Sequence, residues 1–166
     1  MIKLNREANA VVGVFGAHGR ATGLTGMRHL CIIVALLLSS ACSDEVARVR
    51  SPNGLTDAVL MESGGNATVA SSYEVYLTRA GGSSIWGSEV ADLFEAVRSD
   101  SANGLNLRWP ANDSLRIEFL RAQLVNKFVP SVRIHGQTVF VSLDSGIADP
   151  RAPRGGMYYN QQRLHR

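Results

Sequence analysis

The sequence predicts an all-β fold, a small antiparallel meander or sandwich of about five to seven strands with at most one short helix. Residues 71–78 alternate between apolar and polar side chains, and such alternation with aromatic and β-branched residues is typical of strands. Residues 105–109 and 115–119 alternate in the same way around a Pro-Ala-Asn-Asp-Ser turn, so we expect a hairpin. Residues 132–135 and 138–143 flank a Gly-Gln turn and predict a second hairpin.

The other segments carry weaker patterns. Residues 55–62 follow a Ser-Pro-Asn-Gly turn and contain the apolar run Ala-Val-Leu-Met, which predicts the first strand of the domain. Residues 89–97 fit a helical stripe as well as a strand, and both interpretations stay open. Residues 121–131 form a connection that is either helical or looped.

An apolar segment near the N-terminus has the features of a secretory signal peptide. Arg28 and His29 precede the apolar run 30–38, which is too short to span a bilayer. Small residues follow at 39–41, as a signal peptidase requires. We therefore expect a signal peptide over 27–41.

The signal peptide divides the rest of the chain. Residues 1–26 are then an upstream extension without a structure of their own, if translation starts at Met27 rather than at the first methionine. Residues 42–50 are charged and lack periodicity, and so predict a tether. The β domain follows over 51–143, and 144–166, rich in proline and glycine, predict an extended C-terminal tail.

The residues at the end of the signal peptide contain a candidate modification site. Ser39-Ser40-Ala41-Cys42 resembles the lipobox of bacterial lipoproteins, with Ser39 where that family usually has an aliphatic residue. The resemblance implies that Cys42 becomes the mature N-terminus and carries a diacylglyceryl group and acyl chains such as palmitate. Several acyl chains hold a protein on a membrane almost permanently. The alternative is an ordinary signal peptide cleaved near Ala41, which leaves a free thiol.

The two residues after the cysteine bear on localisation. By resemblance to Gram-negative lipoproteins, aspartate directly after the cysteine favours retention in the inner membrane, and serine favours export to the outer one. Ser43 occupies that position here and Asp44 comes one place later. We expect a lipid-anchored protein of the bacterial cell envelope that faces the periplasm, with the outer membrane favoured over the inner.

Charge argues against nucleic acid as a partner. The full chain has 17 Lys+Arg and 14 Asp+Glu, a net charge of +3. Removal of the leader takes away four basic residues and one acidic residue, so 17 − 4 = 13 basic and 14 − 1 = 13 acidic residues remain. The residues removed are Lys3, Arg6, Arg20, Arg28 and Glu7. A formally neutral domain lacks the clustered positive charge that binding to phosphates requires.

Few metal ligands remain after processing. Cys31 lies in the apolar run that is removed, and Cys42 is the expected lipid site. The mature chain keeps two histidines, His135 and His165, and a zinc site would have to rely on carboxylates. We expect no metal and no cofactor.

One sheet face collects arginines if the two hairpins are neighbours. Three arginines on one face can bind a carboxylate or phosphate through paired hydrogen bonds, beside a titratable histidine. The alternative, which we favour, is a solvated face on which Arg108 pairs with Glu118 across the strands. The expected face contains Asn106, Arg108, Arg116, Glu118, Arg133 and His135.

A catalytic triad has weak support. Ser142 or Ser114 with His135 and Asp144 supplies the residue types of a hydrolase. No nucleophile-elbow pattern surrounds either serine, so we do not expect an enzyme.

Two further resemblances concern strand patterns. The Ser-Pro-Asn-Gly turn at 51–54 with the Ala-Val-Leu-Met strand after it, together with the hairpin at 105–119, resembles blades of β-propellers in periplasmic translocation proteins, but the chain is too short for a propeller. The order of segments resembles small bacterial lipoproteins of unknown function, which implies no activity. The sequence therefore predicts a non-enzymatic lipoprotein that binds a protein or cell-wall partner. The alternatives are a small-anion binding or sensing module on the arginine face and, third, a hydrolase.

Overall fold

The computed structural model describes residues 43–64 and 70–164. The predicted upstream extension at 1–26, the signal peptide at 27–41 and the predicted lipid site Cys42 lie outside these residues. The helices formed by residues 43–64 and 70–164 lack the length and apolar composition that a bilayer-spanning helix needs.

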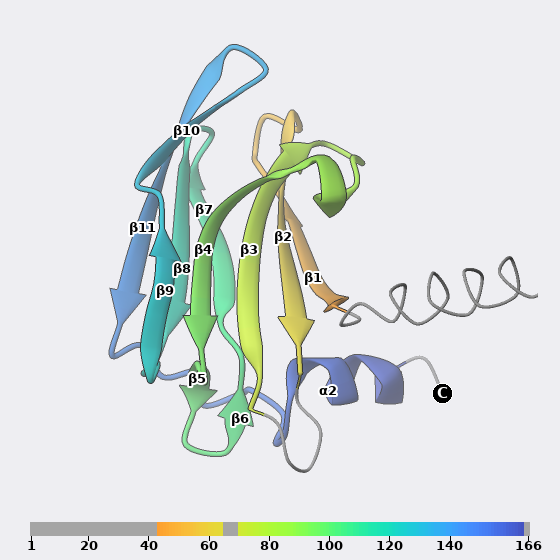
Figure 1. Ribbon diagram of the computed structural model, residues 1–166, viewed down its shortest axis with the longest axis vertical. Helices are drawn as coiled ribbons and strands as arrows, with labels where there is room; N and C mark the ends of the chain where they lie inside the picture. The colour runs from red at the N-terminus through yellow and green to blue at the C-terminus, as the bar shows by residue number, and fades with distance from the viewer. Residues whose placement is uncertain (1–42, 65–69, 165–166) are drawn as a thin grey trace, which may run out of the picture. The chain divides into compact units, whose positions relative to one another are not determined.

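Most of the described residues lie in strands (Figure 1). The strands are β1 (Ser43–Arg50), β2 (Thr56–Ser63), β3 (Ser72–Arg79), β4 (Ser88–Phe94), β5 (Val97–Ser99), β6 (Ala102–Asn103), β7 (Asn106–Ala111), β8 (Ser114–Phe119), β9 (Leu124–Phe128), β10 (Ser131–Ile134) and β11 (Gln137–Ser145). A 3-10 turn, η1 (Ser84–Trp86), precedes β4, and the helix α2 (Met157–Leu164) ends the described chain.

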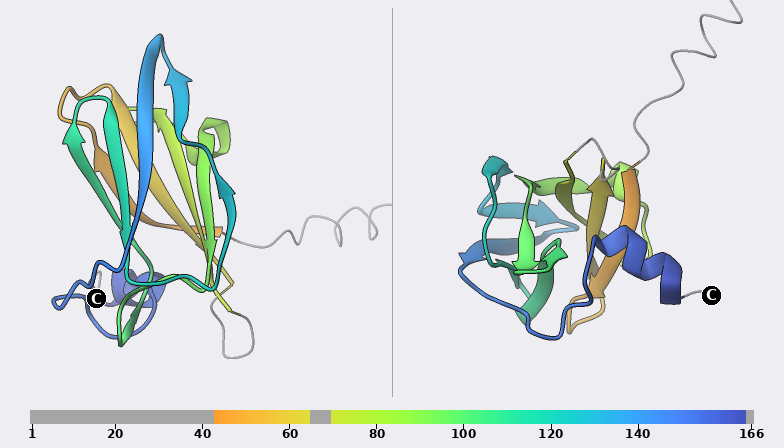
Figure 2. Two further views of the ribbon diagram at one scale, coloured as in Figure 1. Left: turned by 90° about the vertical axis from the view of Figure 1, so that its left-hand side faces the viewer. Right: turned by 90° about the horizontal axis from the view of Figure 1, so that it is seen from below.

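Two sheets face each other as the layers of a sandwich (Figures 1 and 2). The first has the strand order β1-β2-β3-β4-β9 and the second β10-β11-β8-β7, while β5 and β6 form a small ribbon. The predicted all-β class is confirmed. The described part has more strands than predicted, and β8 and β11 pair in parallel, so the second sheet is mixed.

The core lies between the two sheets and follows from the alternation of their strands. Inward positions are apolar on both layers, and burial of each large aliphatic side chain contributes roughly 1.5–3 kcal/mol. Fully buried examples from the first sheet are Leu60, Val75, Leu77 and Leu93, and from the second Leu115, Ile117 and Val139.

Both predicted hairpins are present. β7 and β8 pair antiparallel with Leu107 opposite Ile117, and β10 and β11 pair antiparallel with Ile134 opposite Gln137. The parallel pairing of β8 with β11 makes the two hairpins neighbours in one sheet, as the arginine-face hypothesis required.

The segment predicted as a tether is a strand, so the prediction for 42–50 is wrong from Ser43 onward. β1 pairs with β2 along its length, from Ser43 opposite Ser63 to Arg50 opposite Asp57. Val46 is an extra residue at a bulge between Glu45 and Ala47. A bulge shifts the alternation by one residue, which removes the period-two signal from the sequence.

Residues 89–97, for which helix and strand both stayed open, belong mainly to a strand. β4 covers most of the segment and β5 begins at Val97. Here too a bulge is the cause of the ambiguity, because Val75 pairs with Ala91 and Tyr76 with Glu89, so Val90 is the extra residue. Val90 and Ala91 are both buried, which imitates the spacing of a helical stripe.

Two more expectations need correction. The 121–131 connection contains strand β9, which pairs with β4 at the edge of the first sheet. The tail expected to be extended over 144–166 continues β11 to Ser145 and ends in the helix α2.

Candidate functional site

The predicted arginine face exists on the outer surface of the second sheet. Arg108 and Arg116 lie opposite each other on β7 and β8, and both side chains are exposed. Arg133 lies two strands further on, in β10, opposite Thr138 of β11. The structure therefore confirms that these three arginines share one sheet.

Two of the three arginines bind carboxylates of the same surface. Arg108 Nη1 lies 3.8 Å from Glu118 Oε1, and Arg116 Nε lies 3.4 Å from Asp144 Oδ2. This is the pairing that the solvated-face interpretation predicted for Arg108 and Glu118. Exposed ion pairs contribute little to stability, typically 0–1 kcal/mol. On β7 and β8 the face therefore consists of neighbouring ion pairs, not of an open cluster of positive charge.

His135 does not lie on the arginine face. It forms the turn between β10 and β11 together with Gly136, and both residues have positive φ, 47° and 84°. Positive φ at both central residues matches the twist of the flanking strands in tight hairpins. The expected Gly-Gln turn is therefore shifted by one residue, and His135 leaves the strand.

The residues of the hypothetical triad make other contacts. Ser114 Oγ donates to Asp113 Oδ1 at 3.3 Å, and Asp144 lies beside Arg116. Within the described ranges, 43–64 and 70–164, no hydrogen bond joins His135 to either serine or to Asp144. The described residues also contain no group of three His, Cys, Asp or Glu side chains that could hold a metal ion.

A pocket of about 780 Å³ lies at the end of the sandwich where α2 begins. Its wall combines charged and aromatic side chains from distant segments, so the strand patterns gave no signal for it. The lining includes Glu62, Tyr73, Glu95, Arg121, Tyr158 and Gln162.

The carboxylate of Glu62 organises this pocket. Its Oε1 accepts hydrogen bonds from Tyr73 Oη at 2.9 Å and Ser71 Oγ at 3.1 Å, and its Oε2 accepts from the Tyr158 backbone N–H at 2.7 Å. Burial, together with the charge of Glu62, raises the pKa of Tyr73. With its oxygens occupied in this way, Glu62 holds α2 on the sandwich.

The opposite end of the sandwich carries exposed apolar side chains. Trp86 is 87% exposed, Ile85 83% and Leu55 61%. Leu55 lies in the turn before β2, and η1 presents the other two residues between β3 and β4. The two loops are adjacent, because the Ala80 N–H donates to the Leu55 carbonyl at 3.0 Å. We call Leu55, Ile85 and Trp86 the apolar end.

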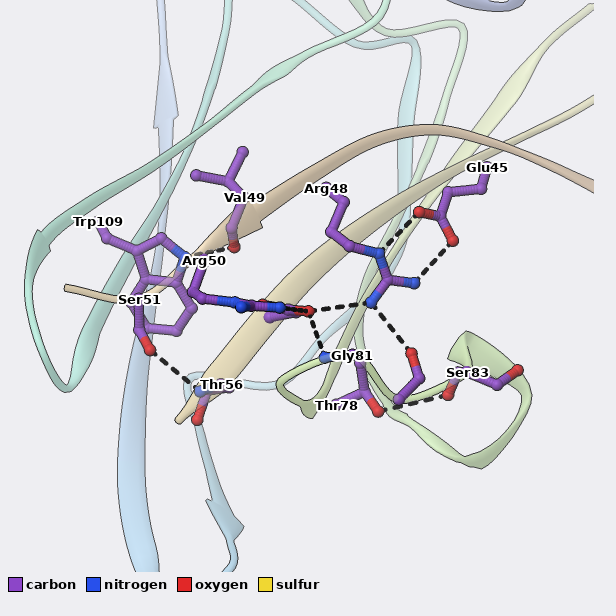
Figure 3. Close-up of polar contacts among 12 residues, drawn as sticks. Glu45, Arg48, Val49, Arg50, Ser51, Thr56, Thr78, Gly81, Ser83 and Trp109 are labelled. Atoms are coloured by element: carbon purple, nitrogen blue, oxygen red, sulfur yellow. Dashed lines mark hydrogen bonds and ion pairs between the residues drawn. The ribbon is translucent and has the colours of Figure 1, made fainter. Parts of the chain in front are cut away.

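The buried carboxylate of Asp57 connects the loops of the apolar end through Arg48, Arg50 and Gly81, which are labelled in Figure 3. Asp57 Oδ1 accepts from Arg50 Nε at 2.8 Å, and Oδ2 accepts from Arg48 Nη1 at 3.2 Å and from the Gly81 N–H at 2.7 Å. The hydrogen bond from Arg50, followed by those from Gly81 and Arg48, lowers the pKa of Asp57 to about 2 against the opposing effect of burial.

The same network extends into the loop before Trp86. Arg48 Nη1 also donates to the Gly82 carbonyl at 3.0 Å, and Thr78 Oγ1 donates to the Ser83 carbonyl at 3.3 Å. Ser83 caps η1, since its Oγ accepts the Ile85 N–H at 3.3 Å. The exposed apolar side chains therefore stand on a loop with several fixed hydrogen bonds.

Comparisons of the chain with models of protein families, with curated proteins and with solved structures find no match. The inference of a function therefore rests on the contacts and the exposure of the described residues.

Proposed function

We propose that this chain is a lipid-anchored lipoprotein of the bacterial cell envelope and acts as a non-enzymatic binding module for an envelope protein. The anchor is Cys42, and the outer membrane, with the domain in the periplasm, is the favoured location. The observation that carries the binding function is the exposure of Ile85 and Trp86 on a hydrogen-bonded loop.

Three physical arguments support a protein partner at the apolar end. Tryptophan is enriched among the residues that dominate the energy of protein interfaces. Trp86 and Ile85 are almost completely exposed, and neighbouring exposed apolar side chains mark interaction sites. The Asp57 network orders the loop before binding, which reduces the entropy cost of complex formation.

Photocrosslinking in the intact cell envelope tests the proposal. Benzoyl-phenylalanine at position 85 is expected to give a discrete crosslinked product, which is lost when the same chain also carries Trp86→Ser. Benzoyl-phenylalanine at position 116, on the arginine face, is the matched control and is expected to give no such product. Equal products from both positions, or none from position 85, would refute the proposal. A crosslinked product that disappears on digestion of the cell wall would identify the cell wall, and not a protein, as the partner.

Small-anion binding is the second candidate function. Arg133 makes no ion pair with the residues that the structure describes. Arg98 is a new candidate, since it is only 9% exposed and its buried Nε has no hydrogen-bond partner among those residues. A buried N–H without an acceptor is costly, and an anion would supply one.

Thermal unfolding with phosphate or acetate separates these two anion sites. Loss of an anion-dependent rise in Tm in Arg98→Met would place the anion at Arg98, and loss in Arg133→Ala would place it on the arginine face. An unchanged Tm with every anion would exclude the second function.

A further inference from the structure

The lipid anchor of the proposed function has a geometric consequence. β1 begins at Ser43, the residue directly after Cys42, and Ser43 is paired with Ser63 of β2. One residue spans at most about 3.6 Å, so an acylated Cys42 leaves no spacer between the lipid and the sandwich. The end of the domain at which β1 begins must therefore lie close to the bilayer surface.

The helix α2 lies at this same end (Figures 1 and 2). Its Tyr158 N–H donates to Glu62, and Glu62 is paired with Asp44, the second residue of β1. The side chains of Tyr158 and Tyr159 are exposed. Tyrosine has an apolar ring and a polar hydroxyl, and is enriched where a membrane meets water.

The charges at this end are mixed. Arg121 and Glu95 line the pocket and are exposed. Asp100 and Arg154 are exposed on two neighbouring segments, which the hydrogen bond from the Gly155 N–H to the Ser101 carbonyl joins. Such a surface gains little from an anionic membrane, so its contact with lipid depends on the anchor and the tyrosines and is insensitive to salt. Because the lipid anchor keeps the domain close to the bilayer, a weak contact between the tyrosines of α2 and the lipid headgroups is sufficient to orient the domain.

The apolar end lies at the other end of the same strands. β1 has eight residues, and at about 3.3 Å per residue it separates the two ends by roughly 25 Å. Leu55 follows the far end of β1, so the apolar end lies well away from the bilayer that holds Cys42 when the paired strands stand steeply on the membrane.

We propose that the domain stands on the membrane with α2 and the neighbouring pocket against the lipid headgroups, and that it presents the apolar end away from the membrane. This inference rests on the lipid anchor of the proposed function. It adds the direction in which the binding surface points and assigns α2 a membrane contact.

Spin labels on the acylated full-length protein test this orientation. The mature chain has no cysteine besides the acylated one, so Gln162→Cys on α2 and Ile85→Cys at the apolar end can each be labelled selectively. The protein is purified from membranes and placed in phosphatidylethanolamine and phosphatidylglycerol vesicles, with the detergent-solubilised protein as the reference. We expect the label at 162 to lose access to a water-soluble nickel complex in the vesicles, at low and high salt, and the label at 85 to keep it.

The experiment distinguishes failure of the proposed orientation from failure of the lipid anchor. Full nickel access at both positions in a protein whose intact mass shows the acyl chains would overturn the orientation and leave the anchor intact. Loss of access at 85 instead of 162 would reverse the orientation. An intact mass without acyl chains would overturn the anchor itself, and the orientation with it.

Discussion

Arg50 donates from Nε to Oδ1 of Asp57 across 2.8 Å, and the Asp57 side chain that accepts this bond is fully buried. The pair joins β1 to β2, and the second oxygen of Asp57 reaches the Gly81 N–H in the loop before η1. One carboxylate thus connects three segments that carry the apolar end. Replacement of Asp57 takes the charged acceptor from the Gly81 N–H and from the part-buried Arg48, so this site is sensitive to substitution.

Asp57→Asn is expected to lower the free energy of unfolding by about 1–3 kcal/mol, because the Gly81 N–H and the part-buried Arg48 lose their charged acceptor. Urea denaturation monitored by circular dichroism measures the change. Asp144→Asn is the matched control, since Asp144 forms an exposed pair with Arg116 and its loss should cost less than about 1 kcal/mol. Equal effects of the two substitutions would mean that the Asp57 network does not stabilise the fold.

Acid should destabilise the protein through the same carboxyl. The pKa of Asp57 is about 2 in the folded protein, below its ordinary value of 3.8, so the folded state binds the proton less tightly than the unfolded chain. The contribution of this group is complete above pH 4 and is lost as the pH falls toward 2, a change of about 2 kcal/mol. Unfolding measured at pH 7, 4 and 2.5 should show a steep decline for the natural protein and a shallower one for Asp57→Asn. Parallel declines would contradict this assignment.

Trp86→Ser should leave stability almost unchanged and remove partner binding. The side chain is 87% exposed, so its loss creates no cavity and should alter the free energy of unfolding by less than about 0.5 kcal/mol. Urea unfolding checks the first expectation and the crosslink from position 85 checks the second. A loss of stability near that of Asp57→Asn would identify Trp86 as a structural residue and remove the main support for the binding function.

Glu62→Gln should loosen α2 selectively. The substituted amide removes the charged acceptor from Tyr73 and from the Tyr158 N–H, at a cost of about 1–3 kcal/mol. Hydrogen exchange should become faster in α2, while the amides of β2 and β3 keep their protection. Glu89→Gln, which affects only a partly exposed pair with Lys127, is the control and should leave α2 unchanged. Equal exchange in α2 for both variants would show that Glu62 does not hold the helix.

The hairpins were predictable from sequence because both of their strands bury one face. Leu107 and Ile117 alternate with Arg108 and Arg116, and the structure places these two pairs on opposite faces of the second sheet. The alternation within a strand does not specify which other strand lies beside it in the sheet. Alternation gives no information on whether β8 pairs with β11 in parallel or antiparallel orientation.

Bulges explain two of the differences between prediction and structure. Val46 in β1 and Val90 in β4 are extra residues that shift the alternation within their strands. Strand β9 was not predicted for another reason. All five of its residues are exposed, so no buried face gives its sequence an alternation of apolar and polar residues. The helix α2 is short, and its position depends on the tertiary hydrogen bond to Glu62.

The functional candidates depend still more on tertiary structure. Arginine and histidine positions in the predicted strands gave the arginine face, but not the ion pair of Arg116 with Asp144 from β11. Asp57 and Trp86 have no local signal, because their roles arise where three separate segments meet. The exposure of the apolar residues around Trp86 follows from the loop that carries it and not from any periodicity.

Intact-mass spectrometry of the membrane-extracted protein, beside a Cys42→Ala variant, tests the lipid anchor most directly. We predict a chain that begins at Cys42 and carries acyl mass, and a Cys42→Ala variant from which this mass is absent. A chain that starts at Met1, uncleaved and without acyl groups, would contradict both the anchor and the orientation of the sandwich on the membrane.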